Sequence, residues 1–137
     1  MLLSKGVTTF RLDAVAFIWK KNGTSCVNLP ETHEIVKLLR LIVNYLNPHA
    51  LIVTATNLPR KENLSYFGNN DEANWIYNFP LPPLILYTFL FEDSSKISGW
   101  SKSMPPAQIN NAYLNFIASH DGICLLYTSD AADELLC

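Results

Sequence analysis

No stretch of this sequence is long and apolar enough to cross a membrane. The longest apolar run, around Leu84 to Phe91, is far shorter than the ~20 residues that a membrane-spanning helix needs. The opening residues, Met1 to Gly6, are too few for a secretory signal peptide. We therefore expect a cytoplasmic protein that has no membrane partner.

The sequence also lacks the motifs of several common sites. Neither GxGxxG nor GxxxxGK followed by Ser or Thr occurs after a candidate strand, so nucleotide-binding folds lose support. Glu31, His33 and Glu34 do not have the HExxH spacing of a metal site, and a single histidine at a helix start is usually solvated or capping. No basic patch suited to nucleic acid is present. These absences predict no metal, no organic cofactor and no nucleic-acid partner.

Cysteine is scarce, and most of it lies at the end of the chain. The three cysteines are Cys26, Cys124 and Cys137. Residues 124–134 resemble the translation of an adapter used in preparing sequencing libraries, so we expect residues 124–137 to be an artefactual or disordered tail. Cys26 is then the one native cysteine, which excludes a disulfide framework and agrees with a reducing compartment.

The remaining composition is that of one small globular domain. Of the 137 residues, 49% are hydrophobic and 16% are charged, which excludes disordered and fibrous classes. The formal charge of −2 depends on three acids of the tail, Asp130, Asp133 and Glu134. Without them nine acidic residues face ten basic ones, so the charge does not indicate a class of partner.

Strand and helix patterns alternate along the chain. We expect strands at Val7–Phe17, Ala50–Thr54, Trp75–Phe79 and Ala112–Ala118, helices at Glu31–Leu46, Pro82–Phe91 and Ser94–Ser101, and a long polar loop at Asn57–Asn74. This order is typical of a parallel sheet with right-handed helical crossovers. Both an open doubly wound sheet and a closed barrel fit it.

Two charged residues interrupt the first predicted strand, which otherwise reads as a buried one. Arg11 and Asp13 are two positions apart, so their side chains point to the same face. A buried salt bridge and a functional site explain them equally well. Polar residues also close two later strands, at Thr54–Asn57 and at His120–Asp121. Because the carboxyl ends of parallel strands share one mouth, we expect these groups to meet in a site where two carboxylates act as acid, base or nucleophile.

Three segments carry a family resemblance. FRLDAVAF, LIVTATN and FIASHDGI, in this order and spacing, resemble motifs of the α-amylase superfamily of retaining glycoside hydrolases and transglucosidases. The longer stretches around them resemble the branch that contains sucrose phosphorylase and the glucosylglycerate phosphorylases. The resemblance covers about residues 6–123. It implies an α/β fold in which residues 1–123 form a partial catalytic domain, a fragment of a (β/α)8 TIM barrel with roughly strands four to seven.

The resemblance also implies roles for individual residues. Asp13 would be the nucleophile that forms a covalent glucosyl ester, and Arg11 would hold its carboxylate ionised. Asp121 would stabilise the transition state, with His120 beside it binding sugar hydroxyls. Inorganic phosphate would then open the ester as co-substrate. The implied reaction moves glucose from sucrose or a glucosyl-glycerate-type glucoside to phosphate.

Ala55 departs from the family pattern. The family has glutamate at this position, which protonates the leaving oxygen and later deprotonates the incoming nucleophile. Because alanine carries no proton, we expect the chain as written to be inactive. A non-catalytic sugar-binding pseudoenzyme and an α-glucoside hydrolase of the same superfamily are the alternatives. Asn74, where related sequences usually have histidine, is a smaller departure that bears on the choice of acceptor.

Overall fold

The computed structural model describes residues 2–106 and 109–119, which fall into two compact units. The first comprises residues up to Tyr77 together with the stretch that ends at Leu114, and the second comprises the residues from Asn78 to Pro106 and from Asn115 onward. The predicted boundary at residue 123 and the predicted tail lie outside the described residues, so the domain division stays a prediction.

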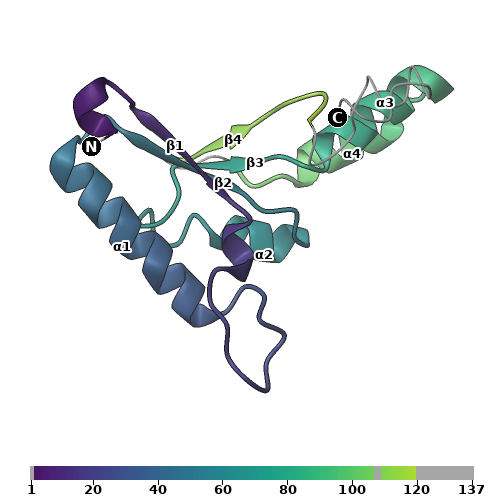
Figure 1. The fold of residues 1–137 in the computed structure, drawn as a ribbon. Coiled ribbons are helices and arrows are strands. Elements are labelled where there is room, and N and C mark those ends of the chain that lie inside the picture. The colour runs from purple at the N-terminus through teal and green to yellow at the C-terminus, as the bar shows by residue number, and fades with distance from the viewer. Residues whose placement is uncertain (1, 107–108, 120–137) are drawn as a thin grey trace, which may run out of the picture. The chain divides into compact units, whose positions relative to one another are not determined.

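The first unit is built on a four-stranded sheet. Its strands are β1 (Thr9–Asp13), β2 (Leu51–Ala55), β3 (Trp75–Tyr77) and β4 (Ala112–Leu114). All pairings are parallel, and each strand lies beside its neighbour in sequence, in the order β1-β2-β3-β4 (Figure 1). A doubly wound sheet reverses its strand order at a switch point, whereas a barrel does not. The observed order confirms the parallel sheet and favours the barrel among the two predicted enclosures.

Helix α1 (Pro30–Leu46) covers one face of this sheet (Figure 1). It begins as predicted, with Pro30 in the first turn, where no amide hydrogen bond is lost, and with Glu31 close to the positive end of the helix dipole. Val36 is fully buried against the sheet. The prediction of this helix is confirmed to within one residue.

Helix α2 (Arg60–Ser65) occupies a stretch that we predicted to be loop. The helix has six residues, which is too short to show an apolar period, and tertiary contacts rather than propensity stabilise helices of this length. Leu64 packs against the core, and Asn63 is buried. The long connection is therefore a helical crossover followed by a turn.

Three of the four strands are shorter than predicted, and β2 has the predicted length but lies one residue later. The first ends at Asp13 because Ala14 adopts a left-handed conformation, with φ of 46°, and starts the 3-10 turn η2 (Val15–Phe17). The third and fourth strands end at Tyr77 and Leu114. The expectation that the first strand is buried on both faces was wrong, since alternate residues from Thr9 to Asp13 are exposed along the edge of the described sheet.

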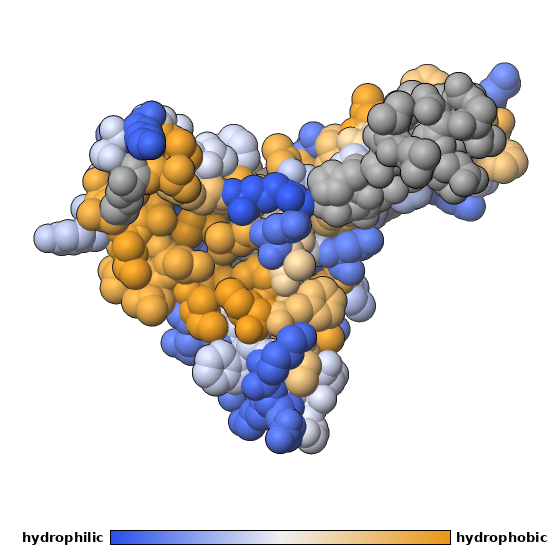
Figure 2. All heavy atoms as spheres, in the orientation of Figure 1, coloured by the Kyte–Doolittle hydropathy of each residue, from blue (hydrophilic) through white to orange (hydrophobic). Residues whose placement is uncertain are grey.

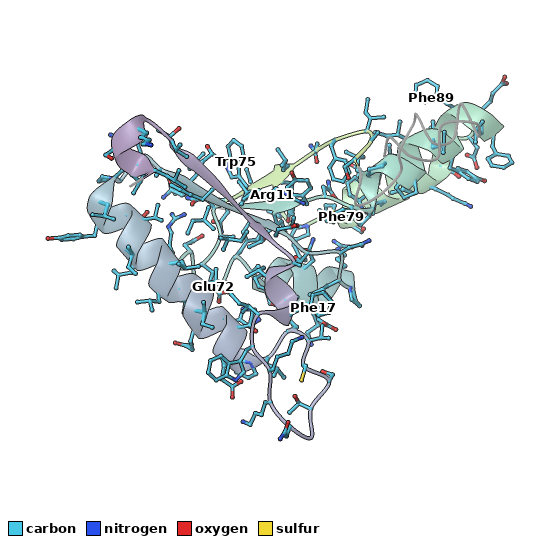
Figure 3. All side chains as sticks on the ribbon, viewed as in Figure 1. Arg11, Phe17, Glu72, Trp75, Phe79 and Phe89 are labelled. Carbon is cyan, nitrogen blue, oxygen red and sulfur yellow. The ribbon has the colours of Figure 1, made fainter. Side chains whose placement is uncertain are left out.

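The core of the first unit lies between the sheet and α1. Strand residues alternate between two faces, and Ile52 and Ile76 point toward the helix. Figure 3 shows Glu72 on this side of the sheet and Trp75 on the opposite side. The fully or nearly fully buried hydrophobic cluster consists of Val15, Ala16, Val36, Ile52, Tyr66, Ala73 and Ile76.

A buried contact between a carboxylate and an imidazole lies at the edge of this core. Glu72 is 3% exposed, and its Oε2 lies 2.7 Å from Nδ1 of His33. The His33 ring stacks on Tyr66 with 4.7 Å between centroids, and burial raises the pKa of the Tyr66 hydroxyl. The expectation that a histidine at the start of α1 is solvated or capping was wrong, because Glu72 follows on a distant turn that folds back against the helix.

Apolar side chains also gather on the surface beside β1. Figure 2 shows them over α1 and the neighbouring strand. They line an open hollow of about 300 Å³, formed by Leu2, Leu3, Phe10, Leu12, Leu39, Ile42, Val43, Leu46 and Ile52. Two of these side chains are on α1 and stay exposed, Ile42 at 44% and Leu46 at 47%. The free edge of β1 is therefore flanked by apolar surface.

The second unit contains two helices, α3 (Leu81–Phe91) and α4 (Ser95–Ser103). Both helices confirm the predictions to within two residues. The Lys96 ammonium lies 3.7 Å from the centroid of the Tyr87 ring, which ties α4 to α3. Phe89, labelled in Figure 3, is 79% exposed. No helix among the described residues is both long and apolar enough to span a membrane.

Gly68 makes the close turn beside Glu72 possible, and replacing it should destabilise the fold. Its φ is +53°, and an added Cβ would clash with Oδ1 of Asp71 and lie 2.9 Å from Oε1 of Glu72. We expect Gly68→Ala to lower the free energy of unfolding by more than ~2 kcal/mol, because backbone strain adds to displacement of the buried carboxylate. Urea unfolding of the purified chain measures this.

Gly23→Ala is the matched control. Gly23 has a φ of +78°, but nothing lies within 4 Å of an added Cβ. Only the backbone term of about 1 kcal/mol applies there. Equal losses in the two variants would show that the contacts of the added Cβ with Asp71 and Glu72 do not matter.

Candidate active site

Asp13 and Ala55 are register partners in adjacent parallel strands. Each is the last residue of its strand, so both lie at the carboxyl end of the sheet. Partners in a parallel ladder project from the same face, and neighbouring strands lie ~4.8 Å apart. The structure therefore brings together the two positions that the sequence motifs singled out on the first two strands.

Arg11 joins this pair from the same face of β1. Its Nη2 lies 2.9 Å from Oδ1 of Asp13. The two side chains are 31% and 65% exposed, so the pair is not the buried salt bridge that the sequence left open. An exposed pair of this kind contributes at most about 1 kcal/mol to stability. Its main effect is to orient the Asp13 carboxylate.

Tyr77 contacts Arg11 from the far side of β2. The guanidinium carbon of Arg11 lies 5.4 Å from the centroid of the Tyr77 ring. Since Val53 is the partner of Trp75, the ladder continues through Thr54 and Ile76 toward Ala55 and Tyr77. The row at the carboxyl end of the sheet thus runs from Asp13 through Ala55 to Tyr77. Sequence reasoning missed this role, because Tyr77 lay within the predicted strand Trp75–Phe79 and no motif singled it out.

The backbone turns sharply just after Asp13. Ala14 is left-handed, which costs a non-glycine residue roughly 1–2 kcal/mol. The turn is held by a hydrogen bond from the Asn28 amide to the Ala16 carbonyl, at 2.8 Å. Backbone strain of this kind clusters at functional sites. Here it leaves the Asp13 carboxylate at the very end of its strand.

Buried amides fix the segment that follows Ala55. The Thr56 hydroxyl donates to Oδ1 of Asn63 at 2.6 Å, and Nδ2 of Asn63 donates to the Tyr77 carbonyl at 3.1 Å. Thr56 is 2% exposed and Asn63 is 7% exposed. This bridge ties the ends of β2 and β3 together. Asn63 lies in the stretch we predicted to be loop, so no pattern in the sequence indicated its position.

His120 and Asp121 lie outside the described residues. The strand that leads toward them, β4, belongs to the same parallel sheet. Their meeting with Asp13 therefore stays a prediction.

Asn74 lies at the other end of the sheet. Its Oδ1 accepts a hydrogen bond from the Ile52 amide at 2.8 Å, and its carbonyl accepts one from the Ala112 amide at 2.9 Å. These contacts tie β2 to β4 at their amino ends. They give Asn74 a structural role at the end of the sheet opposite to Asp13, and its bearing on the choice of acceptor stays a prediction.

Comparison with known proteins gives a consistent set of relatives. No family model matches the chain. The chain is 51% identical over 119 residues to a glucosylglycerate phosphorylase of Allomeiothermus silvanus, covering 86% of this chain and 21% of that protein. It is 45% identical over 124 residues to the Escherichia coli (strain K12) protein of the same name, covering 90% and 22%.

A more distant relative has a different activity in its name. The chain is 34% identical over 132 residues to a trehalose synthase of Thermus thermophilus, covering 96% of this chain and 14% of that protein. The chain thus spans about a fifth of the length of the phosphorylases it matches. With these relatives and this parallel sheet, the chain belongs to the α-amylase superfamily, in the branch of the sucrose and glucosylglycerate phosphorylases.

Proposed function

We propose that this chain provides the nucleophile of a retaining α-glucosyl phosphorylase. The reaction would transfer glucose from a glucosyl-glycerate-type glucoside or sucrose to inorganic phosphate, through an ester on Asp13. The observation that carries the proposal is the register pairing of Asp13 with position 55, with Arg11 2.9 Å from the Asp13 carboxylate. Similarity to two glucosylglycerate phosphorylases supports the choice of reaction.

The spacing of the two positions suits a retaining mechanism. Retaining enzymes hold their two carboxyl groups about 5–5.5 Å apart, whereas inverting enzymes leave room for a water at about 6.5–9.5 Å. Side chains that project from register partners on adjacent strands fall in the shorter range. A carboxylate at position 55 would therefore stand beside Asp13 with no space for an intervening water.

The remaining roles follow the family pattern. Asp13 would attack the anomeric carbon of the glucosyl unit. The glycerate or fructose would leave with its oxygen as the bond between that oxygen and the anomeric carbon breaks. Asp121 and His120 would bind sugar hydroxyls more tightly as positive charge develops on the ring. Phosphate oxygen would then displace Asp13 and release α-glucose 1-phosphate. Phosphate is the co-substrate in this scheme, and no cofactor takes part.

The surface beside β1 supports a place within a closed barrel. Each strand of a barrel has two neighbours, and among the described strands β1 has one. The apolar hollow along that edge is suited to burial by a further strand and helix. We infer that the four strands correspond to roughly strands four to seven of eight.

Ala55 removes the proton carrier from this scheme. The side chain is 7% exposed and consists of one methyl group, so it can neither protonate the leaving oxygen nor activate phosphate. General acid and base assistance contributes about 10²- to 10⁴-fold in rate. The chain as written would therefore turn over natural glucosides slowly, if joined to the rest of a barrel.

A sugar-binding pseudoenzyme is the second candidate. The Arg11 and Asp13 pair is intact while the acid/base is absent, which is the pattern expected of a site that binds without catalysis. Similarity to a trehalose synthase supports a third candidate, a hydrolase or transglucosidase of the same superfamily. Measured activity after restoration of the glutamate separates these candidates.

Restoring glutamate should restore phosphorolysis. We would graft residues 6–123 in place of the matching segment of the Escherichia coli glucosylglycerate phosphorylase. The Ala55→Glu graft should release glucose 1-phosphate from glucosylglycerate, and the Ala55 graft should be slower by ~10²- to 10⁴-fold because it lacks the acid. A phosphate-dependent enzymatic assay for glucose 1-phosphate measures both.

The matched control is Asp13→Asn in the Ala55→Glu graft, which keeps the shape and removes the nucleophile. It should abolish turnover. Equal rates with Ala and Glu at position 55 would contradict the acid/base assignment. Release of free glucose that does not depend on phosphate would favour the hydrolase.

Asp13 should form a stable ester when the leaving group needs no acid. Fluoride leaves without protonation, so α-glucosyl fluoride bypasses the missing glutamate of the Ala55 graft. Without phosphate, we expect Asp13 to gain the mass of one glucosyl group, detected by mass spectrometry of the digested protein. An unlabelled Asp13, or a label that persists in the Asp13→Asn variant, would remove it as the nucleophile.

A further inference from the structure

An open hollow of about 600 Å³ lies at the amino ends of β2, β3 and β4. It is separate from the candidate active site, which lies at the carboxyl ends of the same strands. Its polar lining comes from Arg40, Asn44, His49, Asn74, Asn110 and Asn111. None of its lining residues is acidic. The hollow therefore presents hydrogen-bond donors and one permanent positive charge.

Arg40 is the residue that needs an explanation. Its Nε and Nη1 atoms are buried, and neither has a hydrogen-bond partner among the described residues. Burial lowers the pKa of Arg40, and no neighbouring charge adds to that effect. A buried guanidinium nitrogen without an acceptor is costly, and such groups normally face an anion or ordered water.

The nearby acids are already engaged. Glu34 accepts from the Lys37 ammonium at 2.9 Å. Asp71 accepts from the Asn69 amide at 2.8 Å. Glu72 pairs with His33 at 2.7 Å. Arg40 lines this hollow and also a neighbouring one that Glu34 and Asp71 line, yet neither its Nε nor its Nη1 donates to a carboxylate among the described residues.

The neutral groups around Arg40 complete a cradle for an anion. Asn44 lies one turn further along α1, so its amide is on the same side of the helix as Arg40. Oδ1 of Asn74 accepts from the Ile52 amide, and its amide nitrogen is thereby left as a donor. Nδ2 of Asn111 donates to Asn70, which fixes the opposite wall.

We propose that this hollow is an oxyanion site in which Arg40 binds a phosphate or a carboxylate group. Arginine is the side chain best suited to both groups, because its guanidinium offers several donors in one plane. The anion comes either from solution, as free phosphate, or from an acidic side chain of the same polypeptide. The site would then be a second anion site, independent of the phosphate that the proposed reaction consumes.

Nitrogen NMR of the arginine side chains tests the proposal on the whole 137-residue chain. The Nε–Hε signals come from Arg11, Arg40 and Arg60, and Arg40→Lys identifies the signal of interest. We would titrate inorganic phosphate, acetate and chloride at equal ionic strength. The Arg40 signal should shift and saturate with phosphate or acetate, while the exposed Arg60 should respond to all three salts alike.

The outcomes separate the two sources. Saturation by phosphate alone identifies a free phosphate site, and saturation by acetate alone identifies a carboxylate site. An Arg40 signal that moves no more than the Arg60 signal with either anion overturns the proposal.

Asn44→Asp provides a variant that does not remove the arginine. It places a carboxylate four residues from Arg40 on α1, so the hollow supplies its own anion. We expect the response to added anions to be lost and the thermal unfolding midpoint to rise. An unchanged anion response in Asn44→Asp would also overturn the proposal.

Discussion

The parallel pairing of β1 with β2 is the constraint on which the candidate site depends. Five consecutive residue pairs, from Thr9 with Leu51 to Asp13 with Ala55, set the register. A slip of one residue would turn Asp13 to the face that packs on α1, because side chains alternate along a strand. The apolar residues Phe10 and Leu12 resist that slip, since it would bring them out to the exposed face. Register and core packing therefore fix the same geometry.

The other contacts of the site join the ends of the paired strands. Arg11 reaches both Asp13 on its own strand and Tyr77 two strands away. Asn63 ties the end of β2 to the end of β3 through Thr56 and the Tyr77 carbonyl. On the opposite side of the sheet, Glu72 and His33 hold the turn that leads into β3. The functional groups thus stand on strands whose ends are joined by buried polar contacts, which limits how far they can move.

The sequence indicated the regular elements well, because periodicity reflects burial directly. Helix α1 and the parallel sheet have long apolar patterns, and both are confirmed. Helix α2 is too short to carry such a pattern. The exposure of β1 could not be foreseen either, because an apolar run looks the same whether or not the strand has a neighbour on each side. Pairings such as Glu72 with His33 depend on residues 39 positions apart, and one sequence gives no signal for them.

Motif order placed Asp13 and Ala55 in one site, and the register is in accord with that placement. The central claim is that Asp13 attacks the anomeric carbon from one face of the sugar. A glutamate at position 55 would act as acid and base on the opposite face. Azide tests it most directly, because this small anion can enter the space left by the alanine methyl group. In the Ala55 graft with α-glucosyl fluoride and azide, attack on the Asp13 ester would invert the anomeric carbon a second time. NMR of the product should show α-glucosyl azide. Formation of β-glucosyl azide, which arises when azide displaces fluoride with no ester intermediate, would contradict the account.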